Sequence, residues 1–411
     1  MFLDLIFYGI DTEIKSLRLI SAKAKECHSI QLSKQGLDDR FSQASIDFAK
    51  SLLDEAMASQ VTTSLAADEL HLFKRVRIKD STAFGVHDSL SADFEGYGKG
   101  GGKSSKAAIG IQYEFDIKSH RVLDIDLHSA VKNDSKDAVE KKDDIQKGDL
   151  IIRDLGYYSD QVIDEVQKKE AFFLSRLYSN SIVWVDEHSD KRLDFQALYC
   201  SMQQTQCTSM EMNVYVGKKR RRLRLIVELM PETVYEKRMN KRKKQVKVSG
   251  STITNEFKIR SRFNLFVCNI PTKECPLETI SKLYRTRWQI ELIFKIWKSI
   301  LQIDQIRKMK KERFMTTMYL KLLWIFLNWN IISETRNVLY VTSGKLLSMT
   351  KCFQSMVERN ELLRSGLTNN KIDEIILRFV GLFENNHWVE RRKNRMNFEE
   401  YISVLFCKST I

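Results

Sequence analysis

The sequence predicts a mixed α/β protein whose two ends are helical. Apolar residues alternate with a period of two from Phe73 to about Asp126, as they do in half-buried strands. Residues 12 to about 70 and the chain beyond Ile303 show helical spacing instead. The chain has 411 residues, of which 43% are hydrophobic, so it can bury the cores of more than one domain.

Strands and helices alternate through the middle of the chain. The first three predicted strands are FKRVRIKD, IGIQYEFDI and RVLDIDL. A charged helical stretch from Asp134 to Gln146, a short buried strand LIIRD, a helix opening near Ser159 and a strand FFLSRL come next. This order favours an α/β or α+β domain. From about Tyr178 to Ile270 we expect a predominantly β region.

A helix is predicted to begin at Pro276, because proline suits the first turn of a helix. Laid on one helix, the segment YRTRWQIELIFKIWK places five polar side chains in a sector of about 80° and is apolar over most of the rest. Mixed charges on a mostly buried helix indicate a cleft or a charged ligand, because unpaired buried charge is costly. The alternative is a core helix in which Arg287 or Lys295 neutralises Glu291. The sector holds Tyr284, Arg287, Glu291, Lys295 and Lys298.

The chain is strongly basic. Lys and Arg exceed Asp and Glu by 14, which favours nucleic acid or another polyanion as a partner. From Lys218 to Lys247 there are 13 basic and 3 acidic residues. We expect DNA phosphates to contact the start of this segment, and the alternative is a solvated hairpin tip. The cluster consists of Lys218, Lys219, Arg220, Arg221 and Arg222.

Cysteines and apolar runs predict the compartment. The seven cysteines include no CxxC pair, which favours reduced thiols in the cytoplasm over zinc ligands or disulfides. The first ten residues do not predict a signal peptide, because no basic residue precedes the apolar run and Asp4 interrupts it. The apolar run FMTTMYLKLLWIFLNWNII is interrupted by Lys321, Asn328 and Asn330, so we expect a packed helix and no membrane insertion.

Strand phase separates the acidic residues of the β region. In IQYEFDI the residues Gln112, Glu114 and Asp116 alternate with apolar ones, so we expect them to face solvent. Asp124 and Asp126 are predicted to do the same, with a DxD metal motif as the alternative.

Two other aspartates are in phase with apolar neighbours. Asp80 follows Val76 and Ile78 in the core-facing row of VRIKD, and Asp154 ends the matching row of LIIRD. With Glu291 these carboxylates form a candidate metal site, since Mg²⁺ and Mn²⁺ prefer hard oxygen ligands. Two such ions can activate an attacking water or 3′ hydroxyl and stabilise the leaving oxygen in phosphoryl transfer.

The glycine-rich loop GYGKGGGK resembles two nucleotide-binding motifs, GxGxxG and the end of a P-loop. It leads into a strand where both motifs require a helix, so we expect no nucleotide cofactor and a basic loop that touches the DNA backbone. A GxSxG motif is absent and no cysteine has an evident histidine partner, which argues against the common nucleophile sites.

Three blocks of the sequence resemble a known family. The spacing of Tyr284, Arg287, Glu291 and Lys298 matches the YREK signature of DDE transposases of the insertion sequence 4 family. KDSTAF and IIRDLGYYS resemble that family's two aspartate blocks, and Asp154 follows Asp80 by 74 residues while Glu291 follows Asp154 by 137. The resemblance runs from about Leu32 to about Ile325.

The resemblance implies a ribonuclease H-like catalytic core interrupted by a β-rich insertion. It implies a core in two parts, residues 73–177 and 276–330, around an insertion at 178–275. Residues 1–72 would bind DNA ends, and residues 331–411 would serve dimerisation. Such an enzyme would act in the bacterial cytoplasm, associated with the nucleoid.

The resemblance also implies the chemistry. Asp80, Asp154 and Glu291 would bind two Mg²⁺ ions, for which Mn²⁺ would substitute, and the phosphates of the cleaved end would contact Tyr284, Arg287 and Lys298. The enzyme, a homodimer, would bind the terminal inverted repeats of its element, cut double-stranded DNA there and join the 3′ ends to target DNA. Aromatic candidates for stacking a flipped base are Trp184, Tyr235, Phe263 and Phe266.

Two other functions stay open. An inactive DNA-binding derivative would act as a repressor, although the three carboxylates and the YREK residues are intact. A metal-dependent nuclease without strand transfer would use the same site.

Overall fold

The structure is a computed structural model that describes residues 2–11, 16–60, 72–98, 106–157, 159–178, 180–369 and 371–389. The chain is mixed α/β, as predicted, and divides into two compact units. Unit 1 comprises Met1–Asp68, Ser81–Lys132 and Gln289–Ile411, and unit 2 comprises Glu69–Asp80 and Asn133–Trp288. The boundary therefore cuts the first strand directly after Asp80.

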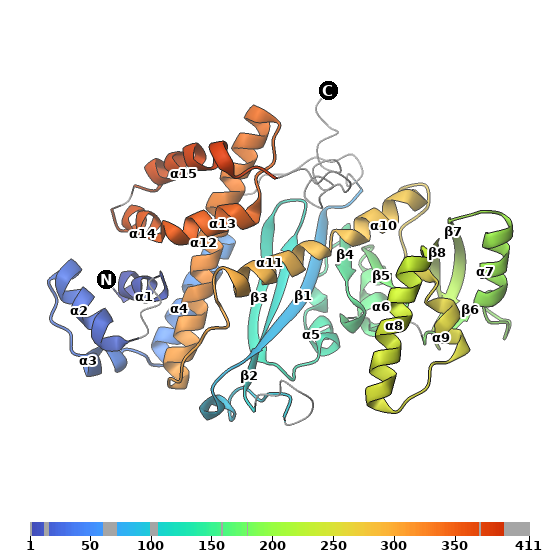
Figure 1. Cartoon of the computed structure of the whole chain (residues 1–411), viewed down its shortest axis with the longest axis horizontal. Coiled ribbons are helices and arrows are strands. Elements are labelled where there is room, and N and C mark those ends of the chain that lie inside the picture. The colour runs from blue at the N-terminus through green and yellow to red at the C-terminus, as the bar shows by residue number, and fades with distance from the viewer. Residues whose placement is uncertain are drawn as a thin grey trace. The chain divides into compact units, whose positions relative to one another are not determined.

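The nine strands of the described residues form one sheet in the order β3-β2-β1-β4-β5-β9-β8-β7-β6 (Figure 1). The neighbours β1, β4 and β5 are parallel, whereas β5–β9, β9–β8, β8–β7 and β7–β6 are antiparallel. The strands span Arg75–Gly85 (β1), Ala108–Asp116 (β2), Arg121–Ser129 (β3), Asp149–Arg153 (β4), Phe172–Arg176 (β5), Val183–Trp184 (β6), Ser209–Val216 (β7), Arg221–Leu229 (β8) and Phe263–Cys268 (β9).

Unit 1 is mainly helical, as its spacing predicts. The 33-residue helix α12 lies against α4, where the Ser45 and Thr316 hydroxyls form a buried hydrogen bond of 2.7 Å (Figure 1). Among the described residues no helix is long and apolar enough to cross a membrane. The helices are α1 (Phe2–Asp11), α2 (Leu17–His28), α3 (Lys34–Asp38), α4 (Gln43–Ala58), α11 (Trp288–Ser299), α12 (Lys311–Ser343), α13 (Met349–Glu358), α14 (Asn360–Asn369) and α15 (Ile372–Asn386). Residues 390–411, also predicted helical, lie outside the described part of the chain.

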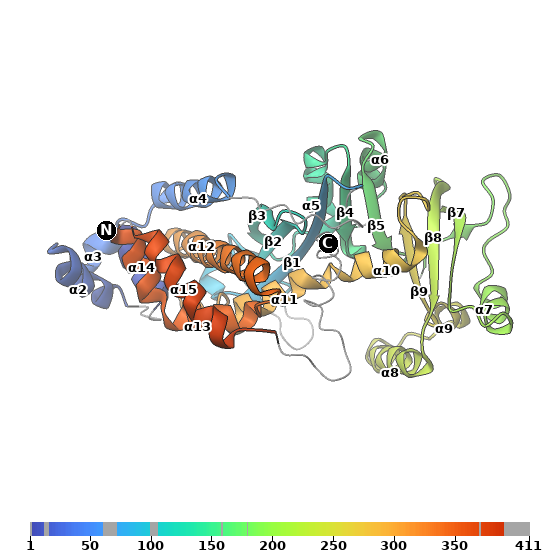
Figure 2. The same ribbon diagram turned by 90° about the horizontal axis from the view of Figure 1, so that it is seen from above.

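Unit 2 has a core shared by its strands and helices, with Ile151, Phe173, Leu225 and Val267 among its buried members. Its helices are α5 (Asp134–Glu140), α6 (Asp160–Lys168), α7 (Phe195–Gln204), α8 (Glu232–Ser249), α9 (Asn255–Arg260) and α10 (Leu277–Arg285). Figure 2 shows α7, α8 and α9 beside the strands β6 to β9. The prediction of a predominantly β region is therefore wrong for residues 232–249, which form an 18-residue helix.

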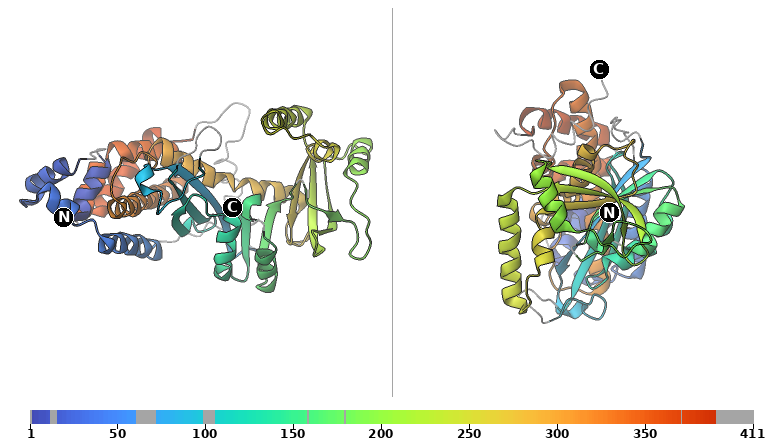
Figure 3. Two further views of the ribbon diagram at one scale, coloured as in Figure 1. Left: turned by 90° about the horizontal axis from the view of Figure 1, so that it is seen from below. Right: turned by 90° about the vertical axis from the view of Figure 1, so that its right-hand side faces the viewer.

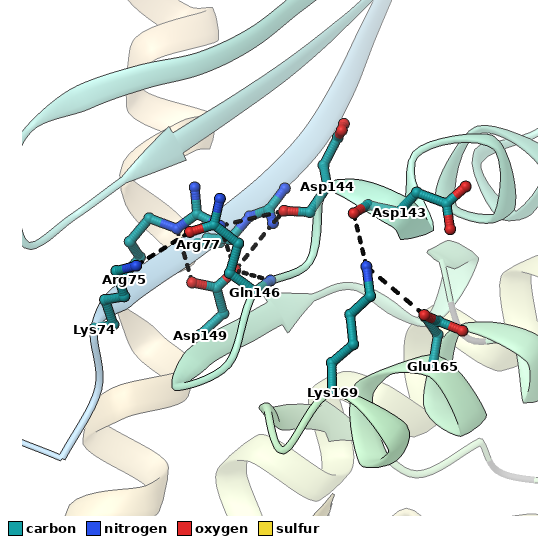
Figure 4. A network of polar contacts seen from close by, with 9 residues as sticks. All are labelled: Lys74, Arg75, Arg77, Asp143, Asp144, Gln146, Asp149, Glu165 and Lys169. Carbon is teal, nitrogen blue, oxygen red and sulfur yellow. Dashed lines mark hydrogen bonds and ion pairs between the residues drawn. The ribbon is translucent and has the colours of Figure 1, made fainter.

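A buried carboxylate links the starts of β1 and β4 (Figure 4). Asp149 is fully buried and accepts hydrogen bonds from Arg75 Nε at 2.7 Å, Arg77 Nη1 at 3.1 Å and the Gln146 backbone N–H at 2.9 Å. Both guanidinium groups also donate to the carbonyl oxygen of Asp144, at 3.2 and 2.8 Å. This network joins paired positions of the two strands, because Arg75 lies opposite Asp149 in the sheet.

The polar row of β2 is buried, contrary to prediction. Gln112, Glu114 and Asp116 are at most 2% exposed, because β2 lies inside the sheet and both of its faces are covered. The Asp116 carboxylate accepts hydrogen bonds from the Lys118 and Ser119 backbone N–H groups in the turn to β3. The alternation of apolar and polar residues therefore distinguishes the two faces of a strand, but it does not show that the polar face is exposed to solvent.

Candidate active site

Two aspartates lie side by side at the ends of neighbouring parallel strands. Lys79 of β1 pairs with Arg153 of β4, so Asp80 and Asp154 occupy the next positions on the two chains. Neighbouring strands are about 4.8 Å apart, which brings these carboxylates within reach of one ion or one phosphate. The carboxyl ends of parallel strands are also where open α/β sheets bind ligands.

A tyrosine of α10 and an arginine just after that helix contact these carboxylates. Arg287 Nη1 donates to Asp80 Oδ2 at 2.7 Å, and the two side chains are 13% and 20% exposed. The Tyr284 hydroxyl lies 3.5 Å from Asp154 Oδ1, and its ring packs on Phe266. Burial raises the pKa of the Tyr284 hydroxyl, which keeps it protonated as a hydrogen-bond donor.

The predicted single helix is interrupted between these residues and the rest of the signature. α10 ends at Arg285, residues 286–287 form a turn, and α11 begins at Trp288, which is 53% exposed. Thr286 is 2% exposed, and its hydroxyl donates to the Leu283 carbonyl at 2.6 Å, which ends the helix with a local hydrogen bond. Placing all five polar residues on one continuous helix was therefore wrong.

Glu291 and Lys298 lie on α11, in unit 1. Glu291 is half-buried in the first turn of the helix. Lys298 Nζ donates to the Ala83 carbonyl of β1 at 3.2 Å, and burial lowers the pKa of this lysine. Lys295 is exposed, which agrees with its lack of an assigned partner. In the described part of the chain no three His, Cys, Asp or Glu side chains cluster as metal ligands, so the ligand set that includes Glu291 stays a prediction.

One cation at this edge was missed by the sequence reasoning. Arg176 ends β5, is exposed, and places its guanidinium 5.5 Å from the centre of the Tyr284 ring. Ile152 pairs with Leu174 in the parallel β4–β5 ladder, so Arg176 lies two positions on, opposite Asp154. The signal was present in the sequence, because FFLSR ends in a polar residue as LIIRD does.

Cations are also buried on the other face of the two strand ends. Lys79 forms an ion pair of 2.6 Å with Asp137 of α5, and both side chains are fully buried. The Arg153 guanidinium lies 5.8 Å from the centre of the Tyr157 ring. Each of these cations directly precedes a site aspartate and points to the opposite face, so it helps to fix the strand end that carries the carboxylate.

Three of the five cations predicted to bind DNA are paired within the protein. Lys219 lies 3.0 Å from Asp164, Arg220 lies 2.7 Å from Asp190, and Arg221 pairs with Asp160 and Asp164. Hydrogen bonds from Arg221 and Lys219 lower the pKa of Asp164. Lys218 and Arg222 are exposed, and no ion pair is recorded for them among the described residues.

The remaining sequence candidates are in structural roles. Phe263 and Phe266 are at most 3% exposed, whereas guanidinium groups cover the rings of Trp184 and Tyr235. In the DxD alternative, Asp126 lies 3.4 Å from Lys132. Residues 99–103 of the glycine-rich loop lie outside the described part of the chain.

Comparison with known proteins identifies the class. Residues 71–327, which include both aspartates and the whole YREK spacing, match the family model described as "Transposase DDE domain". The chain belongs to this transposase family. It is 28% identical over 392 residues to the transposase for insertion sequence element IS231F of Bacillus thuringiensis subsp. israelensis, covering 91% of this chain and 82% of that protein.

Two further relatives carry the same description. The transposase for IS1151 of Clostridium perfringens is 27% identical over 369 residues, which cover 86% of this chain and 77% of the relative. A putative transposase for IS186A of Escherichia coli is 37% identical over 71 residues, which are 17% of this chain and 19% of the relative. The expected class, a DDE transposase that acts on DNA, is therefore confirmed.

Proposed function

We propose that this DDE transposase belongs to the insertion sequence 4 group and performs cut-and-paste transposition. It binds the terminal inverted repeats of its element, cleaves both ends and joins the 3′ ends to target DNA. The observation that carries the proposal is the pair of aspartates on adjacent parallel strands, with Arg287 on Asp80 and Tyr284 beside Asp154. A ribonuclease H-like core around these strands is part of the proposal.

The side chains present fit a divalent cation, which members of this family generally use. Asp80 and Asp154 are adjacent carboxylates, and together with Glu291 they offer the hard oxygen ligands that Mg²⁺ or Mn²⁺ prefers. When bound, two such ions would activate the attacking oxygen and stabilise the leaving oxygen of the phosphodiester.

The other residues would hold the DNA end. The Arg287 guanidinium has five N–H donors in a planar fork, so it can bind Asp80 and a phosphate oxygen together. Tyr284, protonated, would donate to a second phosphate oxygen. Lys298 would supply a point charge, and Arg176 would extend the same positive edge beyond Tyr284.

Carboxylate substitutions test this function. We expect Asp154→Asn and Glu291→Gln to abolish metal-dependent nicking of a duplex that carries the terminal repeat, while binding of that duplex is retained. Asp126→Asn, at a half-exposed aspartate paired with Lys132, is the matched control and should nick at the wild-type rate. Nicking by Glu291→Gln at the wild-type rate would remove Glu291 from the site.

A joining assay separates the proposal from its alternatives. Pre-cleaved ends incubated with a target plasmid should be joined through their 3′ hydroxyls. Nicking without joining would favour a nuclease, and binding without nicking would favour a repressor. In the genome, short terminal inverted repeats bounded by direct duplications are expected around the gene and supply the substrate sequence.

A further inference from the structure

The helix α8 carries a lysine face that the proposed chemistry does not use. Five lysines of this helix are exposed, and neither an ion pair nor a hydrogen bond is recorded for them among the described residues. They are Lys237, Lys241, Lys243, Lys244 and Lys247. At about 100° per residue they occupy a sector of roughly 160°.

The opposite side of α8 attaches the helix to unit 2. Arg238 donates to the Ser261 and Phe263 carbonyls at 3.1 and 2.7 Å and to the Asn264 side chain at 2.5 Å. Tyr235 lies under the Arg262 guanidinium at 4.0 Å, and Met239 is the buried residue of the helix. Figures 2 and 3 show α8 beside the strands β8 and β9, outside the sheet. The anchored side faces the protein, so the lysine face points to solvent.

Repulsion between the lysines of this face destabilises the helix itself. Lys237 and Lys241 are four residues apart and Lys241 and Lys244 are three apart, and Lys247 repeats both spacings with Lys243 and Lys244. Like charges at these spacings destabilise a helix by about 0.2–0.5 kcal/mol per pair. Within the same unit the hairpin cations Lys219, Arg220 and Arg221 are each paired with aspartates. No ion pair recorded among the described residues compensates the lysines of α8, so their charge is available to a polyanionic partner.

The spacing of the lysines fits a phosphate backbone. Lys237, Lys241 and Lys244 form a row along the helix about 10 Å long, from the rise of about 1.5 Å per residue. One DNA strand presents a phosphate about every 3.4 Å of the duplex axis, so four successive phosphates span a comparable length of about 10 Å. A lysine ammonium is a point charge on a flexible stem, without the planar fork that reads a base edge.

We infer that the exposed face of α8 binds the sugar–phosphate backbone of double-stranded DNA independently of its sequence. This surface lies outside the aspartate pair, the YREK residues and the β7–β8 hairpin. The inference rests on the transposase function only in taking DNA as the polyanion.

The test compares two triple variants of the full chain. Lys237→Gln/Lys241→Gln/Lys244→Gln removes the row, and Lys136→Gln/Lys191→Gln/Lys273→Gln removes the same charge from scattered exposed lysines of unit 2. The α8 variant should bind a duplex with the terminal repeat and an unrelated duplex more weakly by the same factor, roughly 100-fold near 0.1 M salt. Its slope of log affinity against log salt should fall by roughly 2 to 3 for both duplexes. The control should bind as the wild type does.

Three results would overturn the inference. One is an α8 variant with the affinity of the control, and another is a loss confined to the terminal-repeat duplex, which would make the contact sequence-specific. The third is unchanged DNA affinity with lost binding to phosphatidylserine vesicles, which would assign the face to an anionic membrane surface. The binding measurement requires no cleavage, so its outcome is independent of whether the chain cuts DNA.

Discussion

The Asp149 network should dominate the stability of unit 2. Substituting Asp149→Asn removes the carboxylate charge that Arg75 and Arg77 share, and these arginines are 21% and 3% exposed. The change leaves two positive charges at a site where the carboxylate was fully buried. Removing one partner of a buried ion pair costs about 3–5 kcal/mol, and each hydrogen bond to a charged group contributes about 1.5–3 kcal/mol without strict additivity. We therefore expect a loss of about 3–5 kcal/mol.

Urea unfolding monitors this loss. With a slope of about 2 kcal/mol per molar urea, the transition of unit 2 should move down by roughly 1.5–2.5 M. Asp190→Asn is the control, since Asp190 pairs with Arg220 but is 92% exposed, and it should cost less than about 1 kcal/mol. Replacing Arg75, Arg77 and Asp149 together by apolar residues of similar size should recover much of the loss. A cost below about 1 kcal/mol for Asp149→Asn would refute the reasoning.

Two further predictions concern Arg176 and His120. In a binding titration, Arg176→Gln should weaken binding of a cleaved-end duplex by roughly tenfold, because one phosphate contact is lost. The control is Arg192→Gln, whose guanidinium lies over Trp184, and it should bind this duplex as the wild type does. Equal effects of the two substitutions would contradict a phosphate contact for Arg176. Burial lowers the pKa of His120 from 6.5 to about 3. As the pH falls below 6.5, His120 therefore binds a proton in the unfolded chain but not in the folded chain, which favours unfolding. Between pH 6.5 and about 3 stability should fall by about 1.4 kcal/mol per pH unit from this group. His120→Asn, which suits the positive φ of 55°, should flatten urea midpoints measured between pH 4.5 and 7, and an unchanged pH dependence would exclude His120 as the cause.

The sequence indicated the position of two aspartates more readily than the helices around them. Asp80 and Asp154 were selected because each ends the apolar row of a short strand, and the structure places these parallel strand ends next to each other. Their role in catalysis stays a prediction. The break at Thr286 was not predictable from spacing, because it depends on a buried hydroxyl and a local hydrogen bond. Helix α8 was missed because charges surround it and only Met239 is buried, so it has no apolar period to detect.

Burial of polar residues was the other source of error. The polar row of β2 was assigned to solvent from alternation alone, yet it faces a second covered side of the sheet. Internal pairing was likewise not visible in the five-cation cluster, whose DNA contact stays a prediction: the aspartates that pair with Lys219, Arg220 and Arg221 lie 30 to 61 positions away in the sequence. Contacts at that separation are set by the fold and leave no local pattern.

The interleaving of the two units along the chain also governs how this protein can fold during synthesis. The hydrogen bond between Ser45 and Thr316 spans 271 residues, and unit 2 takes its first strand from residues made before most of unit 1. A ribosome must therefore complete α12 before α4 gains its packing partner, and the apolar face of α4 stays exposed meanwhile. Contacts this distant in sequence slow folding, because a long loop must close before they form. Chains released before α12 is made would lack this partner and be prone to aggregation.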